Sequence, residues 1–267
     1  MKELKLAVIG KDVSRSGSPS MHAFIAKKLG YKVEYDKISI PEDQFDPAIC
    51  RIFENYDGFN VTIPFKLPII KYLDKIVGDA EVFGAVNTVN VKDKAGYNTD
   101  GLGFTLMLKC GGVDVKGKNV LLIGAGGAGR SVAKKLSDSG ASVFVYDKNT
   151  DSARSLEREF KGITALENLQ NTPYYALINA SGVGMHRTEG LSPVGEELIS
   201  LCEVAIDLIY EPRVSKFLEI AESFGKKTLN GWPMLFYQAY YAACIFAGVE
   251  PDEITAKKLF TEYLEEL

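Results

Sequence analysis

The sequence has few of the residues that stabilise secreted or metal-binding proteins. Its four cysteines lie far apart, none forms a CxxC pair, and none stands at a metal-ligand spacing from either of the two histidines. We therefore expect no metal site, and we interpret the cysteines as small, buried hydrophobic residues in a reducing compartment.

Long apolar runs are also missing. No stretch of about 18 apolar residues occurs, so no segment has the length of a membrane-spanning helix. The N-terminus, MKELKLAVIG, has too short an apolar run for a signal peptide and leads directly into a strand pattern. These features predict a cytoplasmic protein without a membrane partner.

Positive charge is not in excess. The formal net charge is −4 at pH 7 and the pI is near 5.4, and no basic block occurs, so we expect no nucleic-acid partner. An anionic ligand must then be held by a local cluster and not by the overall field. With 46% hydrophobic and 25% charged residues, the composition is close to that of an average globular protein, which argues against disorder.

Strand-like and helix-like segments alternate through nearly the whole chain, which predicts an α/β fold with mainly parallel sheets. The 267 residues fit two domains of ordinary size or one large domain. A glycine- and charge-rich stretch at 111–119 is the expected domain boundary. Two helices, expected at 231–247 and 251–267, follow the final predicted strand, and the pattern alone does not decide which domain they join.

Two polar residues of the first half are expected at the starts of helices. We expect Ser18 to cap a helix whose first turn contains Pro19. Lys66 is expected in the first turn of a short helix. The first-half elements are predicted as strands at 4–10, 32–39, 58–62 and 86–91, and as helices at 19–29, 41–55, 64–73 and from 101 onward. The second-half strands are predicted before Gly124 and at 141–148, 174–181 and 202–210.

A glycine-rich turn is the main motif of the second half. Gly124, Gly126 and Gly129 match G-x-G-x-x-G between the buried-strand run VLLIG and the helical run RSVAKKL. Dinucleotide binding needs these glycines for a tight turn, for close approach of the backbone to the pyrophosphate, and for helix–strand packing. The phosphates would rest at the helix N-terminus, where free amides favour an anion. The alternative is a tight turn that binds no ligand.

The residue that closes the next strand bears on the choice of cofactor. Asp147 can accept hydrogen bonds from an adenosine ribose and would repel a 2′-phosphate, which favours NAD. The alternative for Asp147 is a turn or helix-capping role. Lys148 follows directly and could bind a phosphate, so the sequence leans towards NAD and still admits NADP.

Polar side chains gather near predicted strand ends in the first half. The two hydroxyls of Ser16 and Ser18 suit a carboxylate or a polyol, although Ser18 alone could serve as a cap. A lysine such as Lys66 is usually a solvated charge, and Asp100 could cap the following helix. The further members of the group are Asn60, Thr62 and Asn87. Capping alone does not explain so many amides and hydroxyls together with one lysine and one carboxylate.

With these motifs in this order, the chain resembles the shikimate dehydrogenase family, which includes the quinate/shikimate dehydrogenases. The resemblance runs over nearly the whole length. It rests on the Ser-x-Ser-Pro loop at Ser16, NVTIPFK, GAVNT, NTDG, GAGGAGR, the DLIY-x-P run from Asp207 to Pro212, and MLFYQA.

The resemblance implies two α/β domains, the second of them a Rossmann-type doubly wound domain. The substrate-binding catalytic domain would contain residues 1–110 plus 235–267, and the dinucleotide-binding domain residues 111–234. Lys66 and Asp100 would be the catalytic pair. The implied substrate contacts are Ser16, Ser18, Asn60, Thr62, Asn87, Tyr210 and Gln238. The expected cofactor contacts are Gly124, Ala125, Gly126, Gly127, Gly129, Arg130, Asp147, Lys148, Ser181 and Gly231.

The activity implied is the reversible, NAD(P)-dependent reduction of 3-dehydroshikimate to shikimate, by a monomer or homodimer. NADP-dependent members usually carry Asn-Arg-Thr where this chain has Asp147, Lys148 and Asn149, which leaves the choice between NADP and NAD open. The alternatives are a quinate/shikimate dehydrogenase that prefers NAD, a folate-type methylene dehydrogenase, and a non-catalytic ligand sensor. The serine loop and Asp100 argue against the folate enzyme, and a sensor would need a DNA-binding module.

Overall fold

The computed structural model describes residues 2–267, and the chain forms two compact units. Unit 1 contains the chain up to Gly103 together with Phe236–Leu267, and unit 2 contains Phe104–Leu235. The C-terminal helices therefore belong to the same unit as the N-terminal strands. No helix within residues 2–267 is both long and apolar enough to cross a membrane.

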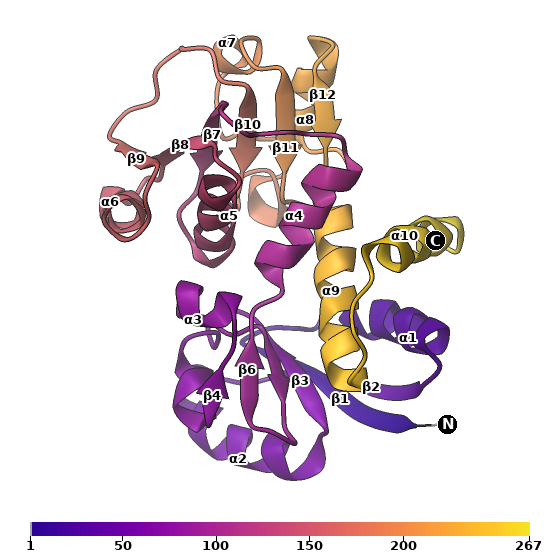
Figure 1. Ribbon diagram of the computed structural model, residues 1–267. Helices are drawn as coiled ribbons and strands as arrows, with labels where there is room; N and C mark the ends of the chain where they lie inside the picture. The colour runs from indigo at the N-terminus through magenta and orange to yellow at the C-terminus, as the bar shows by residue number, and fades with distance from the viewer. Residues whose placement is uncertain (1) are drawn as a thin grey trace. The chain divides into compact units, whose positions relative to one another are not determined.

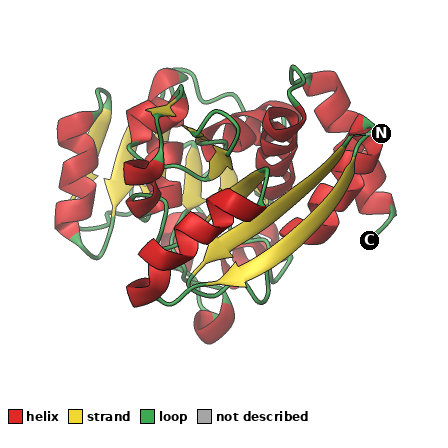
Figure 2. Ribbon diagram, turned by 90° about the horizontal axis from the view of Figure 1, so that it is seen from below, coloured by secondary structure: helices red, strands yellow, loops and turns green. Residues whose placement is uncertain are grey.

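Unit 1 is built on a mixed sheet of six strands. Its two longest strands, β1 and β2, lie side by side in parallel (Figure 2). Strand β3 is parallel to β1, whereas β5 is antiparallel to both β3 and β6. In sheet order the strands are β2 (Lys32–Ser39), β1 (Glu3–Gly10), β3 (Gly58–Val61), β5 (Thr88–Asn90), β6 (Ala95–Tyr97) and β4 (Lys75–Ile76).

Helices cover both faces of this sheet, because alternate residues of β1 point to opposite sides. Leu4 and Leu6 pack against α1 (Ser18–Leu29) and α9 (Trp232–Ala247). On the other face, Ala7 and Ile9 pack with α2 and with the 3₁₀ helix η2. The remaining elements of unit 1 are η1 (Glu42–Gln44), α2 (Phe45–Asn55), η2 (Pro68–Tyr72), α3 (Asp79–Phe83) and α10 (Glu253–Glu265). Helix α4 (Asp100–Cys110) begins in unit 1 and continues into unit 2 from Phe104 onward.

The strand directions bring several chain segments to one edge of the sheet. Strands β1, β3 and β6 end at this edge, and the antiparallel β5 begins there, with Asn60 opposite Thr88. Polar residues that follow β1, β3 and β6 or precede β5 therefore become neighbours.

Unit 2 is built on a six-stranded sheet in which every neighbouring pair is parallel. The chain order of the strands across the sheet is 3-2-1-4-5-6, visible in Figure 1 from β9 to β12. This is the order of the doubly wound dinucleotide-binding fold, whose ligands bind where the winding reverses. The strands are β7 (Asn119–Ile123), β8 (Ser142–Tyr146), β9 (Ile163–Leu166), β10 (Ala176–Asn179), β11 (Val204–Asp207) and β12 (Lys227–Leu229).

The helices of unit 2 connect these strands. On one face, Leu121 and Leu177 pack against α7 and α8, whose buried residues include Leu198 and Phe217. Helix α5 begins directly after β7, at the reversal point. The helices are α5 (Gly127–Asp138), α6 (Thr150–Glu159), α7 (Glu196–Ile199) and α8 (Lys216–Ser223), with a 3₁₀ turn η3 (His186–Thr188).

The structure confirms the predicted fold class and corrects two local predictions. Residues 63–67 form turns, and the first helical residue is Pro68, so Lys66 lies before the helix and not in its first turn. Ser18 is the first residue of α1, the capping position belongs to Gly17, and no side chain among the described residues caps that end. The serine hydroxyls are instead hydrogen-bonded to each other, as described below.

Candidate active site

Lys66 and Asp100 form an ion pair at the polar edge of the unit 1 sheet. The distance from Lys66 Nζ to Asp100 Oδ2 is 2.6 Å, and the two side chains are 21% and 13% exposed. Partial burial distinguishes this pair from surface ion pairs, which contribute little to stability. The two residues are far apart in sequence, Lys66 in the turn before η2 and Asp100 at the start of α4, so the fold assembles the pair.

The loop that carries Lys66 is anchored on both sides of the lysine. The preceding Phe65 is buried and stacks on Phe45, with ring centroids 4.3 Å apart. The backbone carbonyl of Lys66 accepts a hydrogen bond of 2.8 Å from the amide of Val86, just before β5. The backbone at Lys66 is therefore held while its side chain remains partly open to solvent.

Asp100 is the first residue of α4, where the helix dipole favours a carboxylate. Its amide donates to Asn98 Oδ1 over 3.1 Å. Its Oδ1 accepts a hydrogen bond of 2.8 Å from Asn87 Nδ2, while Oδ2 faces Lys66. Both carboxylate oxygens therefore bond to other residues of the site.

The side-chain amide of Asn87 uses its full donor capacity within the protein. Its two N–H groups reach Thr99 Oγ1 at 3.0 Å and Asp100 Oδ1 at 2.8 Å. Its oxygen accepts from Thr88 Oγ1 and from the amide of Thr99, each at 2.9 Å. An amide has two donors, so in this structure Asn87 orients Asp100 and has no N–H left for a substrate.

Asn60 is buried and similarly occupied. Its Oδ1 accepts a hydrogen bond of 2.7 Å from the Tyr35 hydroxyl. Its Nδ2 donates to the carbonyl of Asn87 at 3.2 Å and to Thr88 Oγ1 at 3.0 Å. Any direct contact of Asn60 with a ligand is therefore limited to the second lone pair of its oxygen.

The serine loop lies after β1. Ser16 Oγ donates to Ser18 Oγ over 3.0 Å, and the Ser18 amide donates to Ser16 Oγ over 3.2 Å. The loop is tied to β2 because Lys37 Nζ donates to the Ser14 carbonyl, and the amide of Val13 donates to Ser39 Oγ. Two neighbouring hydroxyls are thus presented on a braced loop.

Thr62 and Gln238 complete the predicted contacts within unit 1. Thr62 follows β3, and its amide donates to the Ile9 carbonyl over 2.9 Å. Gln238 comes from α9, and its Oε1 accepts a 3.4 Å bond from Thr99 Oγ1. Helix α9 therefore contributes a side chain directly to the sheet edge that holds Asp100. Tyr210, the remaining predicted substrate contact, belongs to unit 2, where its ring lies edge-on to Trp232, and its role stays a prediction.

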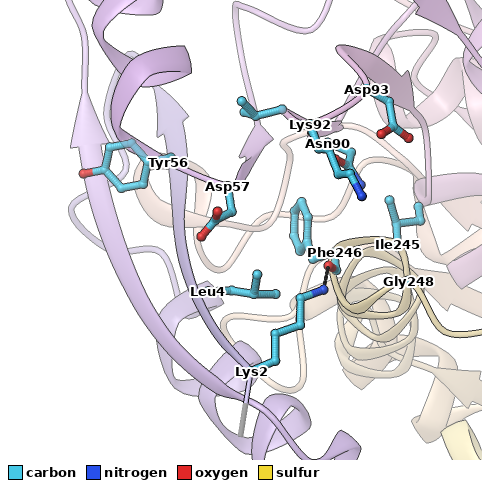
Figure 3. A pocket seen from close by; sticks show the side chains of 11 residues that line it. Lys2, Leu4, Tyr56, Asp57, Asn90, Lys92, Asp93, Ile245, Phe246 and Gly248 are labelled. Carbon is cyan, nitrogen blue, oxygen red and sulfur yellow. Dashed lines mark hydrogen bonds between the residues drawn. The ribbon is translucent and has the colours of Figure 1, made fainter.

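The cavity in unit 1 with a volume of about 430 Å³ lies at the opposite edge of the sheet (Figure 3). Its lining includes Lys2 before β1 and Asp57 before β3, so it opens where the strands begin. Lys2 Nζ donates there to the carbonyls of Phe246 and Ala247 at the end of α9. Its described lining residues all differ from those predicted for the site, and we place the site at the Lys66 edge.

The three motif glycines of unit 2 have different environments. A Cβ on Gly129 would lie 2.1 Å from the Gly124 carbonyl oxygen, and one on Gly124 would lie 2.8 Å from the backbone of Ala180 and Ser181. Gly124 also has a φ of +106°, which disfavours other residues. A Cβ on Gly126 would meet no described atom within 4 Å. Packing requires the first and third glycines, whereas the space above the second suits a pyrophosphate.

Asp147 bonds to the glycine turn itself. Its Oδ2 accepts a hydrogen bond of 2.6 Å from the amide of Ala125, and its Oδ1 accepts one of 2.8 Å from the amide of Asn149. The Ala125 amide is therefore directed at a carboxylate of the protein. Lys148 is exposed beside it. The carboxylate keeps spare lone pairs for a ribose.

A loop follows β10 on the other side of the reversal point. Asn179 is fully buried, and its oxygen accepts from both the amide and the hydroxyl of Ser181. Its Nδ2 donates to the Val183 carbonyl and to Asp207 Oδ1, each at 3.0 Å. Asp207 is also buried, and burial raises the pKa of its carboxyl, while its bond from Ser215 opposes that shift. This network shapes the loop that carries Ser181.

Of three further predicted cofactor contacts, two have internal packing roles. Arg130 forms an ion pair with Glu159 and lies over the Phe160 ring. Gly231 is buried, and a Cβ there would lie 2.1 Å from the Leu208 carbonyl oxygen. Gly127 is exposed, and a Cβ there would meet no described atom within 4 Å. The contacts of all three with a cofactor stay predictions.

The sequence did not indicate Tyr35 or Asp207 as members of the two networks. Thr88 stands beside Asn87 in the GAVNT motif, and such Asn-Thr pairs at strand ends predict donors and acceptors suited to a polyol. Asp207 lies inside the predicted strand at 202–210, and only the structure shows that it closes β11, at the same sheet edge as the glycine turn. Tyr35 lies within a strand of alternating charge, and its local sequence contains no signal for a buried hydroxyl.

Together, a doubly wound sheet with a glycine turn and an ammonium–carboxylate pair among hydroxyls and amides are the features of a nicotinamide-dependent oxidoreductase. Two family profiles match the chain: "Shikimate dehydrogenase substrate binding domain" over residues 8–89 and "Shikimate / quinate 5-dehydrogenase" over residues 106–183. The shikimate dehydrogenase (NADP(+)) of Carboxydothermus hydrogenoformans is 36% identical over 270 residues, covering 96% of each chain. The chain belongs to the shikimate dehydrogenase family.

Solved structures agree with this assignment. A chorismate mutase/shikimate 5-dehydrogenase fusion protein from Clostridium acetobutylicum matches with a TM-score of 0.90 and 33% identity, over 100% of this chain and 98% of that one. The Thermus thermophilus shikimate 5-dehydrogenase in complex with NADP(H) and shikimate matches with a TM-score of 0.86 and 34% identity, over 97% and 99%. Since the Carboxydothermus and Thermus proteins are described with NADP, they do not support the leaning towards NAD.

Proposed function

We propose that this protein catalyses the reversible, NAD(P)-dependent reduction of 3-dehydroshikimate to shikimate, in the biosynthesis of chorismate and the aromatic amino acids. The observation that carries the proposal is the pairing of Lys66 Nζ with Asp100 Oδ2 at 2.6 Å, on a sheet edge lined by hydroxyls and amides. The family assignment narrows the ligand class to shikimate-like rings. The comparisons do not favour any of the three alternatives, which are a quinate-preferring dehydrogenase, a folate-type methylene dehydrogenase and a non-catalytic ligand sensor.

Lys66 acts on the reacting oxygen. An ammonium has three N–H donors, and one of them is directed at Asp100. A second can donate to the ring oxygen and stabilise the negative charge that develops on it during reduction, and the ammonium can then supply the proton. Asp100 holds the lysine in place through the same bond. A nicotinamide bound to the protein supplies or accepts the hydride.

The remaining polar groups of unit 1 orient the ring. Ser16 and Ser18 present adjacent hydroxyls on a braced loop, which suits the substrate carboxylate. Thr62 and Gln238 lie at the same edge as Lys66 and suit ring hydroxyls. Because Asn60 and Asn87 already donate both of their amide protons, their contribution is to hold Asp100 and the surrounding hydroxyls.

We assign the dinucleotide to unit 2 and the ring substrate to unit 1. The open space above Gly126, next to the N-terminus of α5, fits a pyrophosphate. The choice between NAD and NADP depends on Asp147, whose charge opposes a 2′-phosphate. All four cysteines are free, which supports a reducing, cytoplasmic setting. Cys202 and Cys244 are buried as expected, whereas Cys50 is exposed and Cys110 is half-buried, so the interpretation as buried residues is wrong for these two.

Steady-state kinetics with shikimate and with quinate, each with NAD and with NADP, test the proposal. We expect kcat/KM for shikimate to exceed that for quinate by at least about tenfold with either cofactor. Both substrates would use the same site, so this ratio measures the specificity of the site. Absence of dinucleotide reduction with shikimate, whether NAD or NADP is supplied, would falsify the assigned activity.

A further inference from the structure

A chain of hydrogen bonds runs from β2 to the catalytic pair, and all of its donors point the same way. The Tyr35 hydroxyl donates to Asn60 Oδ1 at 2.7 Å, and Asn60 Nδ2 donates to Thr88 Oγ1 at 3.0 Å. Thr88 Oγ1 donates to Asn87 Oδ1 at 2.9 Å, and Asn87 Nδ2 donates to Asp100 Oδ1 at 2.8 Å. The series begins at a group that can donate and ends on a carboxylate.

The first member of this chain is held rigidly. The Tyr35 ring stacks on the buried His22, with centroids 4.7 Å apart and planes at 22°. Burial raises the pKa of the Tyr35 hydroxyl, and the Ser18 side chain nearby opposes that shift. Tyr35 therefore remains a protonated donor at neutral pH, and it lies between the serine loop and Asn60.

We propose that Tyr35 and Thr88 are positioning residues that orient the amides of Asn60 and Asn87, so that the last donor of the chain faces Asp100. This inference rests on the proposed function of the Lys66 and Asp100 pair. A carboxamide can turn over and exchange its oxygen and nitrogen at almost no cost in volume. At Asn60 the backbone carbonyl of Asn87 accepts from Nδ2, and the Tyr35 hydroxyl completes this arrangement by donating to Oδ1. A turned amide would lose the bond to the carbonyl and the proton given by Tyr35.

The Thr88 hydroxyl passes this orientation on. It accepts from Asn60 and has a single proton, which it gives to the oxygen of Asn87. The backbone amide of Thr99 donates to the same oxygen, and together the two donors turn the nitrogen of Asn87 towards Asp100. Hydrogen bonds in such a series polarise one another, so a change at the first donor affects the last acceptor.

Four variants test the proposal, with shikimate turnover as the readout. Tyr35→Phe removes the first donor, and Thr88→Val replaces the relay by a residue of the same shape. Each is expected to lower kcat/KM for shikimate about tenfold, the effect of roughly one hydrogen bond, with little change in the KM of the dinucleotide. Thr88→Ser keeps the hydroxyl and should restore activity to within about twofold.

The fourth variant is the double substitution Tyr35→Phe with Thr88→Val. Because both residues act through the same amides, the combined loss should be clearly smaller than the product of the single losses. Tyr56→Phe is the matched control: the Tyr56 hydroxyl donates to Asp36 Oδ2 at 2.7 Å, also on β2 but outside the chain. It should leave kcat/KM unchanged.

The outcomes separate the inference from the proposed function. A wild-type enzyme inactive with shikimate contradicts the proposed function. An active wild type whose folded Tyr35→Phe variant keeps full kcat/KM overturns the inference alone, as do multiplicative losses in the double variant. If Tyr35→Phe does not fold, the Thr88→Val and Thr88→Ser pair decides: equal activity of the two overturns the inference.

Discussion

The two units prepare for their ligands in different ways. Unit 1 presents side chains: a lysine, a carboxylate, hydroxyls and amides that meet at one sheet edge and are bonded to one another. Unit 2 presents backbone: a glycine turn whose second glycine has open space above it and whose other two glycines are required by packing. What unit 1 offers a ligand therefore depends on the identity of its side chains, whereas what unit 2 offers depends on glycines that carry no side chain.

The units also differ in the ionisable groups that they bury. In unit 1, burial lowers the pKa of His22 to about 3, so the imidazole is neutral in the folded protein. In unit 2, burial raises the pKa of Asp207. As the pH falls, His22 is protonated more readily in the unfolded chain than in the folded protein, so acid destabilises the fold at this residue. Asp207 is protonated more readily in the folded protein, so acid removes a buried charge there and stabilises the fold. These two buried groups should therefore contribute to the acid sensitivity of folding in opposite directions.

The largest effect is expected at Lys66. Lys66→Ala should lower kcat by about 10²–10⁴-fold, because the general acid and the stabilising charge are lost together, with a smaller change in the KM for shikimate. Lys71→Ala is the matched control, since Lys71 is an exposed lysine of η2 that pairs with Asp46 of α2. Near-wild-type kcat in the Lys66 variant removes this residue from the mechanism.

His22 should make folding sensitive to acid. Its pKa is near 3 when folded against an ordinary value of 6.5, so the stabilisation present above pH 6.5 is lost progressively as the pH falls towards 3. At pH 4.5 the loss should be about 2–3 kcal/mol. His22→Leu should reduce the difference in the free energy of unfolding between pH 7 and pH 4.5 by that amount.

Urea unfolding followed by circular dichroism and by fluorescence measures this effect. The single tryptophan, Trp232, belongs to unit 2, so its fluorescence follows that unit. The His22 effect should appear in the circular dichroism transition more than in the fluorescence transition. An equal acid sensitivity in wild type and variant contradicts the assignment of a neutral, buried imidazole.

The glycine turn can be divided into packing and binding roles by two alanine substitutions. Gly129→Ala should destabilise the protein by about 1–3 kcal/mol, because its Cβ meets the Gly124 carbonyl. Gly126→Ala should change stability by less than about 0.5 kcal/mol and raise the KM of the dinucleotide about tenfold or more, with the KM of shikimate unchanged. Thermal unfolding and kinetics of both variants check this, and an unchanged dinucleotide KM in Gly126→Ala moves the pyrophosphate elsewhere.

The smallest effect concerns Asp147. Asp147→Asn removes the charge that opposes a 2′-phosphate, so the ratio of kcat/KM for NADP to that for NAD should rise about tenfold. The substitution also loses one of the two backbone bonds to the carboxylate, so both cofactors should bind somewhat more weakly. The ratio is therefore the quantity to compare, and an unchanged ratio excludes Asp147 from cofactor choice.

Motifs made the fold class predictable from the sequence. The buried run before Gly124 and the helix after it predicted the strand–turn–helix at the reversal point of the unit 2 sheet. Lys66 and Asp100 were predicted as a pair, and the structure brings them within 2.6 Å. Segments with strong patterns and motifs in a known order carry this information locally.

Other features depended on contacts between distant segments. The short strands β4 and β12 exist because neighbouring strands supply partners, and their few residues have no distinctive pattern. The hydrogen-bond partners of the Asn60 and Asn87 side-chain amides include Tyr35 and Thr88, which only the fold places against them. Lys66 lies in a turn because Phe65 anchors the loop in the core, and this packing overrides the helical pattern.

The division of unit 1 between the two ends of the chain has a consequence for biosynthesis. A ribosome completes residues 104–235 before it makes the rest of α9 and the whole of α10, so unit 2 can fold while unit 1 still lacks these helical segments. Until then, Leu4 and Leu6 of the first strand have no Phe246 to cover them. This apolar face must therefore be shielded until Phe246 has been made, and unit 1 is completed after unit 2.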